Sequence, residues 1–309
     1  MRTLLVVLAL LGALAGEAAA ATGSLVGVRP LAPDGSWIVL RAAPGTVASA
    51  DAVVLNLTDE PQAVDLSTAD ATTTADGVFT LAGAGEAATG VGAWIDAPTG
   101  RLRLAPRERR VVPLRVRVPA DARPGDHAGG LVVQSASAAG TAQAGGVAVR
   151  VVERVGLRVY VTVEGARVGA VAVDGLAAEV TGRGGLSGAL GLGGRAGVRF
   201  GVRNAGNMVH ERLRGEVALV EGGRTLATRP LDLGTLLPGD VRPVGLELPL
   251  PRWSPGDYRV EVRIHGEPPA TAAAGVHVGG ARLWGAGGLA LGAVALTGAG
   301  VGLRRRRAA

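Results

Sequence analysis

Histidine and acidic side chains are the residues that could perform acid–base or metal chemistry in this chain. The four histidines are His127, His210, His265 and His277. They form no HExxH or HxH pattern, so the sequence predicts no metal site. No G-x-S-x-G motif marks a nucleophilic serine, although two distant carboxylates could still meet as a glycosidase pair. Asp126-His127 is the one polar cluster that stands out, and we expect no catalytic residue, no cofactor and no enzyme.

Tryptophan and arginine side chains could instead bind a polymer. Trp37 and Trp94 could stack on sugar rings, and with Asp126 and His127 they are the candidate ligand-binding residues. Each Trp lies beside Ile in a run typical of a strand, which favours a core position over stacking. The arginines within 101–117 could form a cationic face for anionic wall polymers. They equally fit the solvated outer face of alternating strands, which we favour.

The composition excludes several classes of protein. The chain has 309 residues and no Cys, so it uses neither disulfides nor Cys-ligated metals. The net charge is +6, and all 32 basic residues are Arg. A nucleic-acid-binding face needs clustered basic residues with aromatics between them. Only 3% of the residues are aromatic, so we expect no nucleic-acid partner.

The N-terminus has the pattern of an export signal. Arg2 supplies a positive charge, 4–14 is apolar, and the small residues 18–20 suit a signal peptidase. The apolar core is too short for a membrane helix, which needs ~20 residues. The sequence therefore predicts a signal peptide over 1–21.

The C-terminus has the pattern of a membrane anchor. The run 283–303 contains no charged residue and is about as long as one membrane crossing. Four arginines follow at once, and positive charge marks the cytoplasmic side of a membrane helix. We expect a transmembrane helix at 283–303 and a cytoplasmic basic tail at 304–309. This predicts a single-pass type I protein of the cell membrane, with its ectodomain on the extracellular, cell-wall side.

Short runs of alternating apolar residues recur between these ends. Examples are 51–57, 112–118, 147–151, 198–202 and 258–264. Alternation with a period of two is typical of strands with one buried face. Fifty glycines and 17 prolines supply turns between them. The sequence therefore predicts an all-β fold.

The strand runs fall into two groups separated by a glycine-rich stretch. We expect two tandem immunoglobulin-like β-sandwich domains, the first at 22–155 and the second at 198–280. Between them, 156–197 is expected to be a connecting strand and a Gly-rich linker. The glycines at 181–197 lack the preceding strand and following helix of a phosphate-binding loop, so no nucleotide site is predicted.

The run VPADARPGDHAGGL at 118–131 is the most distinctive stretch of the chain. With several shorter motifs it resembles the peptidoglycan-binding domain of the WxL-interacting proteins, surface proteins of Gram-positive bacteria. The shorter motifs are Trp37-Ile38, Asn56-Leu57-Thr58, Asp76-Gly77, Trp94-Ile95 and Val111-Val112-Pro113. The resemblance covers about residues 24–155. On residue chemistry alone the same run also fits a corner between strands, because Pro fixes φ and Gly permits a tight turn.

The resemblance implies a first domain that binds peptidoglycan and a second that binds partner proteins. We therefore expect a non-catalytic, membrane-anchored surface protein that binds cell-wall peptidoglycan, an anionic wall polymer or another exported protein. One alternative is a structural or assembly factor that presents a sandwich edge to partner surface proteins. A wall-modifying enzyme is the third possibility, and a groove lined by paired carboxylates would favour it.

Overall fold

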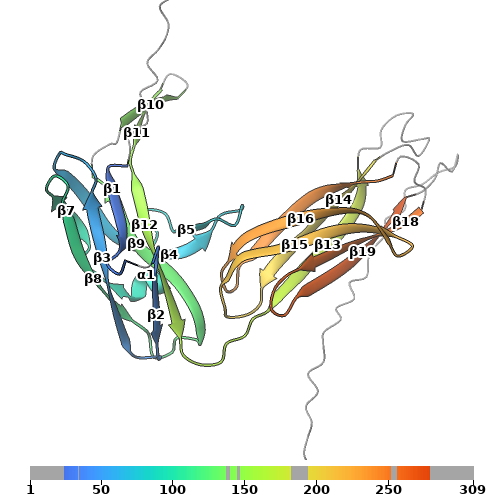
Figure 1. Cartoon of the computed structure of the whole chain (residues 1–309), viewed down its shortest axis with the longest axis horizontal. Helices are drawn as coiled ribbons and strands as arrows, with labels where there is room; N and C mark the ends of the chain where they lie inside the picture. Colours follow the sequence, from blue (N-terminus) through green and yellow to red (C-terminus); the bar gives the residue numbers. More distant parts are fainter. Residues whose placement is uncertain are drawn as a thin grey trace, which may run out of the picture.

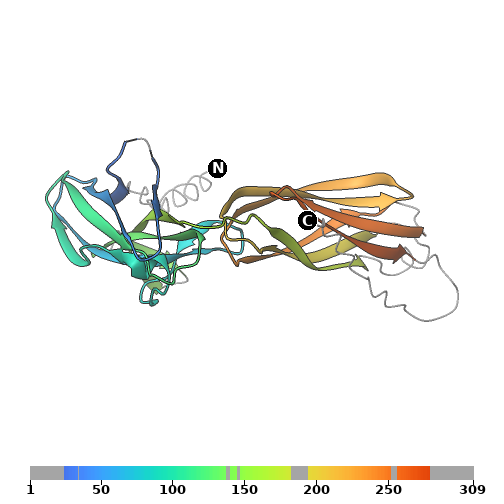
Figure 2. The ribbon, with the colours of Figure 1, turned by 90° about the horizontal axis from the view of Figure 1, so that it is seen from below.

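The chain forms two lobes. The computed structural model describes residues 24–33, 35–136, 140–144, 147–181, 194–251 and 256–278. Figure 1 shows the first lobe in blue to green and the second in yellow to red, and Figure 2 shows the two lobes end to end. The predicted signal peptide at 1–21 lies outside the described residues, as does most of the Gly-rich stretch.

The first lobe consists of two main sheets and a separate hairpin. The order of the first sheet is β1-β3-β8-β6, and that of the second is β2-β12-β9-β4-β5, with β7 also paired to β4. The separate hairpin is β10–β11. The bounds are β1 Val26–Pro30, β2 Ile38–Ala42, β3 Val47–Asn56, β4 Gln62–Thr73, β5 Phe79–Leu81, β6 Ile95–Asp96, β7 Gly100–Leu104, β8 Arg109–Arg117, β9 Gly125–Ser135, β10 Gly140–Ala144, β11 Val147–Val151 and β12 Arg154–Val163.

The alternating sequence of β8 explains how these strands form the core. Val112, Leu114 and Val116 are buried, whereas the arginines between and beside them are exposed. Each such buried side chain contributes about 1.5–3 kcal/mol. The buried residues join those of β3, β4, β9 and β12 in one hydrophobic cluster between the two sheets.

The chain changes sheet between its first two strands. β1 pairs antiparallel with β3 in one sheet, and β2 pairs parallel with β12 in the other. β2 covers only the residues Val159 to Val163 of β12, because the chain reaches this edge at Ile38. The first half of β12 therefore has no hydrogen-bonded strand on that side, although β1 of the other sheet lies near it.

The second lobe also consists of two sheets. Their orders are β13-β14-β17 and β16-β15-β18-β19. A second hydrophobic cluster lies between them. The bounds are β13 Val171–Thr181, β14 Arg195–Asn204, β15 His210–Glu221, β16 Arg224–Leu236, β17 Val241–Pro249, β18 Gly256–Ile264 and β19 Ala270–Val278.

The protein is mostly β-strand, as the sequence predicts. The boundaries between the lobes differ from the expected ones, because the expected linker 156–197 contains strands of both. β12 belongs to the first lobe through its pairing with β9, and β13 belongs to the second through its pairing with β14. Alternation alone cannot assign a strand to a sheet, since pairing partners lie far away in the sequence.

The only helix within the described residues is α1 (Val91–Trp94). No helix of this part of the chain is long and apolar enough to cross a membrane. The four residues of α1 are far short of the ~20 that a crossing needs. The predicted transmembrane helix at 283–303 lies outside the described residues and has no support. No helix in the described residues supports the predicted location, a single-pass type I protein of the cell membrane.

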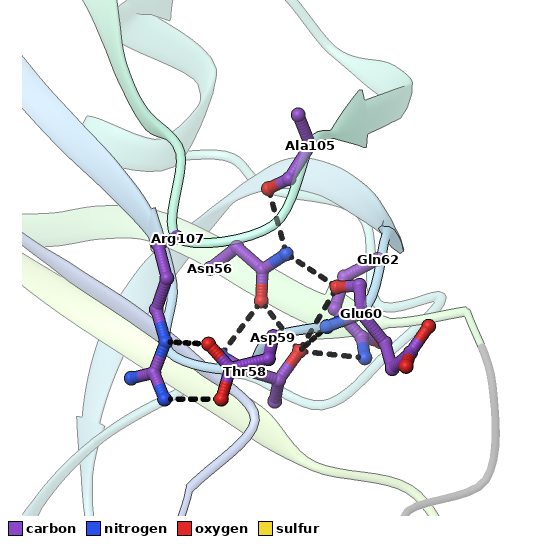
Figure 3. Close-up of polar contacts among 7 residues, drawn as sticks. All are labelled: Asn56, Thr58, Asp59, Glu60, Gln62, Ala105 and Arg107. Carbon is purple, nitrogen blue, oxygen red and sulfur yellow. Dashed lines mark hydrogen bonds and ion pairs between the residues drawn. The ribbon is translucent and has the colours of Figure 1, made fainter.

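A buried asparagine ends β3 and holds the following turn. The side-chain amide of Asn56 donates to the carbonyls of Glu60 and Ala105, both at 2.8 Å. Its oxygen accepts from the backbone N–H of Thr58 at 2.9 Å and from the Thr58 hydroxyl. Figure 3 shows this network, with the exposed ion pair of Arg107 and Asp59 beside it. Because Asn56 is only 3% exposed, these bonds satisfy groups that water cannot reach.

Candidate functional site

Trp37 lies at the outer face of the first lobe, just before β2. It is 39% exposed, and its ring meets that of Tyr160 edge-on, with the centroids 6.3 Å apart. Tyr160 in turn contacts Phe79, with the ring centroids 5.7 Å apart. The structure therefore places Trp37 at the exposed end of an aromatic row and not in the core between the sheets.

Trp94 and His127 come together elsewhere in the lobe. Trp94, at the end of α1, packs against the main hydrophobic cluster. Its ring lies 4.8 Å from that of His127, centroid to centroid. His127 Nε2 is 2.8 Å from the carbonyl oxygen of Arg123, so the imidazole is held within the first lobe. The structure does not bring Trp37 into this group.

Asp126 lies at the junction of the two lobes. Its carboxylate accepts hydrogen bonds from the Thr162 hydroxyl at 2.8 Å, from Arg167 Nη2 at 2.9 Å and from the Val209 N–H at 3.1 Å. Val209 belongs to the second lobe. The Asp126 N–H also donates to the carbonyl of Asn207 at 2.7 Å. Both the carboxylate and the N–H of Asp126 therefore take part in joining the lobes, which argues for a structural role.

A second contact between the lobes lies at the end of the β4–β5 hairpin, which reaches toward the second lobe in Figure 1. The Thr73 hydroxyl donates to the Asp240 carboxylate at 2.8 Å, and the Thr235 N–H donates to the carbonyl of Gly77 at 3.0 Å. Nearby, Leu237 packs on Phe79 and Tyr160 in a small hydrophobic cluster. The two junctions together hold the outer face of the β12 sheet against one end of the second lobe.

The first half of β12 has an unpaired edge next to this junction. β12 pairs with β9 along its whole length, from Arg154 to Val163. On the other side β2 pairs only from Val159 onward, and no other strand within the described residues pairs with Arg154–Arg158. An unpaired edge presents backbone N–H and C=O groups that can accept another strand. We call Arg154–Arg158 the open edge.

Two glycines, Gly130 and Gly156, leave a shallow hollow in the outer face beside the open edge. A Cβ on Gly156 would lie 2.7 Å from Leu81 Cδ1, and one on Gly130 would lie 2.3 Å from the carbonyl oxygen of Leu157. Only glycine lets β5 approach β12 and β9 this closely. The result is a shallow pocket of about 210 Å³, lined by Phe79, Thr80, Leu81, Val132, Arg154, Gly156 and Arg158.

Two arginines border this pocket. The Arg154 guanidinium donates to the carbonyls of Leu81 and Ala82, which fastens β5 over β12. Arg158 lies over the Phe79 ring, 4.4 Å from its centroid, a distance at which cation–π attraction acts. Neither arginine forms an ion pair in the described part of the chain. The pocket therefore has a mostly polar accessible surface, with two arginines at its border and the side chains of Phe79, Leu81 and Val132 among its lining.

Tyr160 lies beneath this border, facing the second lobe. It is 8% exposed, and burial raises the pKa of its hydroxyl, with a further contribution from the charge of Glu211. The neutral phenol is therefore the form present at ordinary pH. Its ring serves as a contact between Trp37, Phe79 and Leu237.

Of the residues around the open edge, the sequence singled out only Trp37. Arg154, Gly156 and Arg158 alternate with Val155 and Leu157, a pattern that fits the outer face of a strand. The sequence pattern does not give the length of β2, which decides where the edge of β12 is left unpaired. That length depends on where the chain crosses between sheets, and no local pattern reports it.

Comparisons with known proteins find similarity only among solved structures. No family model matches the chain, and no curated protein matches it. A chaperone–tip adhesin complex of CFA/I fimbriae biogenesis is 6% identical, over 78% of this chain and 92% of that chain, with a TM-score of 0.38. The Pseudomonas aeruginosa CupB2 chaperone is 10% identical over 79% and 98%, with a TM-score of 0.35. The E. coli chaperone DraB is 12% identical over 80% and 94%, with a TM-score of 0.34.

These comparisons correct the resemblance inferred from the sequence. The assignment to the WxL-interacting family is wrong, since no model of that family matches and the similar structures are pilus chaperones. The prediction of a membrane-anchored, peptidoglycan-binding surface protein of Gram-positive bacteria is wrong with it. The run 118–131 that suggested it forms a corner and the start of β9. The similar solved structures named above are of chaperones, and the sequence predicts that this protein is not an enzyme.

Proposed function

We propose that this protein binds an extended segment of another exported protein, which adds as a strand to the open edge of β12. The observation that supports this most is the partial pairing of β12, covered by β2 only from Val159 onward. A segment bound along Arg154–Arg158 would continue the line of β2. Its backbone would gain the hydrogen bonds that the edge now lacks.

The surroundings of the open edge supply specificity for such a segment. Alternate side chains of an added strand point to the two faces of the sheet. Those on the outer face would meet Trp37, Phe79 and the floor of the shallow pocket. The border formed by Arg158 favours an acidic residue at a flanking position, because its guanidinium has no carboxylate partner in the described residues. We infer a partner segment that alternates apolar residues with at least one acidic residue.

The two lobes have separate tasks in this proposal. We assign both to the immunoglobulin-like sandwich class, each with two sheets over one core. The first lobe carries the binding edge, and the second supports the outer face through Leu237 and the bonds to Asp126. In the matched complexes the chaperone's partner is a pilin or a tip adhesin. For this chain we propose only an extended segment of an exported protein.

Site-specific photo-cross-linking tests the proposal. The full chain carries a benzophenone amino acid in place of Trp37 and is irradiated in an envelope extract of its native cells. Leu57 is the matched control position, since it is 40% exposed where Trp37 is 39% exposed. We expect position 37 to cross-link to an exported protein, and excess unmodified chain to suppress the product. Equal products from both positions, or products that the competitor does not suppress, would overturn the proposal.

A charge variant adds a test of the same edge. Arg158→Glu reverses the charge beside the pocket, so it should weaken cross-linking from position 37 about tenfold or more. Arg115→Glu, at an exposed position of β8 on the other sheet, is the control and should leave the yield unchanged. An unchanged yield in Arg158→Glu would remove this arginine from the proposed site.

A further inference from the structure

An apolar pocket lies where the chain crosses from β1 to β2. It has a volume of about 460 Å³ and is lined by residues 30–32, 35, 37–40, 50 and 51. The lining therefore combines the end of β1, the start of β2 and two residues of β3. All of these residues except Asp51 are apolar or glycine. We call this the crossover pocket.

Three large side chains of the crossover pocket are exposed to solvent. Leu31 is 43% exposed, Trp37 39% and Val39 65%. A single exposed apolar side chain is common on a protein surface, whereas several around one hollow indicate an interaction site. A cavity of about 150 Å³ holds a benzene ring, so the crossover pocket has room for a bulky apolar side chain.

Trp37 connects the crossover pocket to the open edge of β12. Its ring contacts that of Tyr160 on β12, and it also lines the crossover pocket. Ile38, the next residue, pairs with Val159 at the point where the open edge ends. A strand added along Arg154–Arg158 cannot continue in the sheet beyond this range, because β2 occupies the next positions. The added segment therefore has to leave the sheet beside Trp37.

We propose that the crossover pocket binds a bulky apolar side chain of the same exported segment, just beyond the residues that pair with the open edge. The proposal rests on the proposed function and adds a requirement for an apolar anchor next to the strand-forming part of the segment. The anchor covers Leu31 and Val39 and packs against Trp37. A large apolar side chain seated in a pocket is typical of the residues that contribute most to binding.

The charges near the two pockets have opposite signs. Asp51 is exposed in the lining of the crossover pocket, and its carboxylate forms no ion pair with any residue that the structure describes. Arg29 on the neighbouring strand β1 donates to the carbonyl of Pro30 instead. Arg158 lies beside the open edge. Because opposite charges attract across an interface, the matching segment carries an acidic residue near Arg158, then the apolar anchor, then a basic residue near Asp51.

Photo-cross-linking from within the crossover pocket tests this inference. The full chain carries the benzophenone amino acid in place of Val39 and is irradiated in the same envelope extract. We expect the product to contain the exported protein that cross-links at position 37, and mass spectrometry should place the two cross-links in one short stretch of that protein. Val111, which is 49% exposed on the outer face of the other sheet, is the control position and should give no such product.

Charged variants of the crossover pocket give a second test, with the benzophenone at Thr80. This residue lines the shallow pocket beside the open edge, so it reports binding there without altering the crossover pocket. Leu31→Asp and Val39→Asp should each lower the cross-linking yield about tenfold or more, because the apolar anchor would then bury a carboxylate. Val111→Asp should leave the yield unchanged. Urea unfolding midpoints check that both variants fold, and if either does not, the cross-link from position 39 decides.

The outcomes separate this inference from the proposed function. If positions 37 and 80 give no product that excess unmodified chain suppresses, strand addition is wrong and the apolar anchor with it. A product from position 80 that both charged variants leave unchanged would overturn the apolar anchor alone. So would a product from position 39 that contains a second copy of this chain, or a protein other than the one found at position 37.

Discussion

Asn56 and Asn204 make matching hydrogen bonds to the backbone in the two lobes. Asn204 ends β14 as Asn56 ends β3, and its amide donates to the carbonyls of Met208 at 2.7 Å and Leu236 at 3.1 Å. Its oxygen accepts from the N–H of the second residue along, Gly206, as that of Asn56 accepts from Thr58. In each lobe one amide therefore fixes the turn after its strand to a distant loop.

Replacing either asparagine should destabilise its lobe. Asn56→Ala or Asn204→Ala removes the three side-chain bonds that hold the turn after its strand, so we expect a loss of about 2 kcal/mol in the free energy of unfolding. Urea denaturation followed by far-ultraviolet circular dichroism measures it. Gln62→Ala is the control, because this more accessible side chain makes one bond to Thr58, and its loss should stay within about 0.5 kcal/mol. Equal losses in all three variants would contradict the account.

Gly130 should tolerate no side chain. A Cβ there would meet the carbonyl oxygen of Leu157, and backbone inside a paired sheet cannot move away cheaply. We expect Gly130→Ala to lower the stability by about 1–3 kcal/mol and to loosen β5 from β12. Gly245→Ala is the matched control, since a Cβ at that position would meet no atom within 4 Å. Thermal unfolding of the two variants side by side gives the comparison.

Asp126 should control how firmly the lobes are held together. Asp126→Ala removes the acceptor for Thr162, Arg167 and the Val209 N–H. Small-angle X-ray scattering should then show a wider distribution of lobe arrangements, at unchanged strand content. The control is Asp121→Ala, an exposed position in the preceding turn. Scattering curves of Asp126→Ala that superimpose on those of the unmodified chain would show that other contacts suffice.

His210 should make stability depend on pH. Burial lowers the pKa of its imidazole in the folded chain below the ordinary value of 6.5. The unfolded chain therefore binds a proton at a higher pH than the folded chain does. Stability from this group is fully present above pH 6.5 and is lost as the pH falls from there toward the folded pKa. Urea midpoints at about pH 7.5 and about pH 5.5 should differ more for the unmodified chain than for His210→Gln; an equal difference would remove His210 as a cause.

Local sequence patterns predicted the strands well where alternation was complete. β18 is the example, with Tyr258, Val260, Val262 and Ile264 buried and the residues between them more accessible. β12 shows the limit of such patterns. Its alternation is equally clear, but its place in the first lobe depends on pairing with β9 and β2, which no local pattern encodes.

The candidate site residues show the same limit. The sequence showed Asp126-His127 as a polar cluster. In the structure the Asp126 carboxylate accepts a hydrogen bond from the Val209 N–H, 83 residues away. His127 instead contacts the Arg123 carbonyl and the Trp94 ring. The interpretation of the run 118–131 as a corner needed only the conformational preferences of Pro and Gly. The family resemblance inferred from the same run is wrong, because a corner of this kind can arise in unrelated β-sandwiches.

Hydrogen–deuterium exchange at the open edge tests the central claim most directly. The exchange of the full chain alone is compared with that of its complex with the exported protein that cross-links at position 37. We predict slower exchange of the backbone amides in Arg154–Arg158 on binding, because an added strand would engage this edge. Unchanged exchange there, with slowing confined to the second lobe, would contradict strand addition at β12.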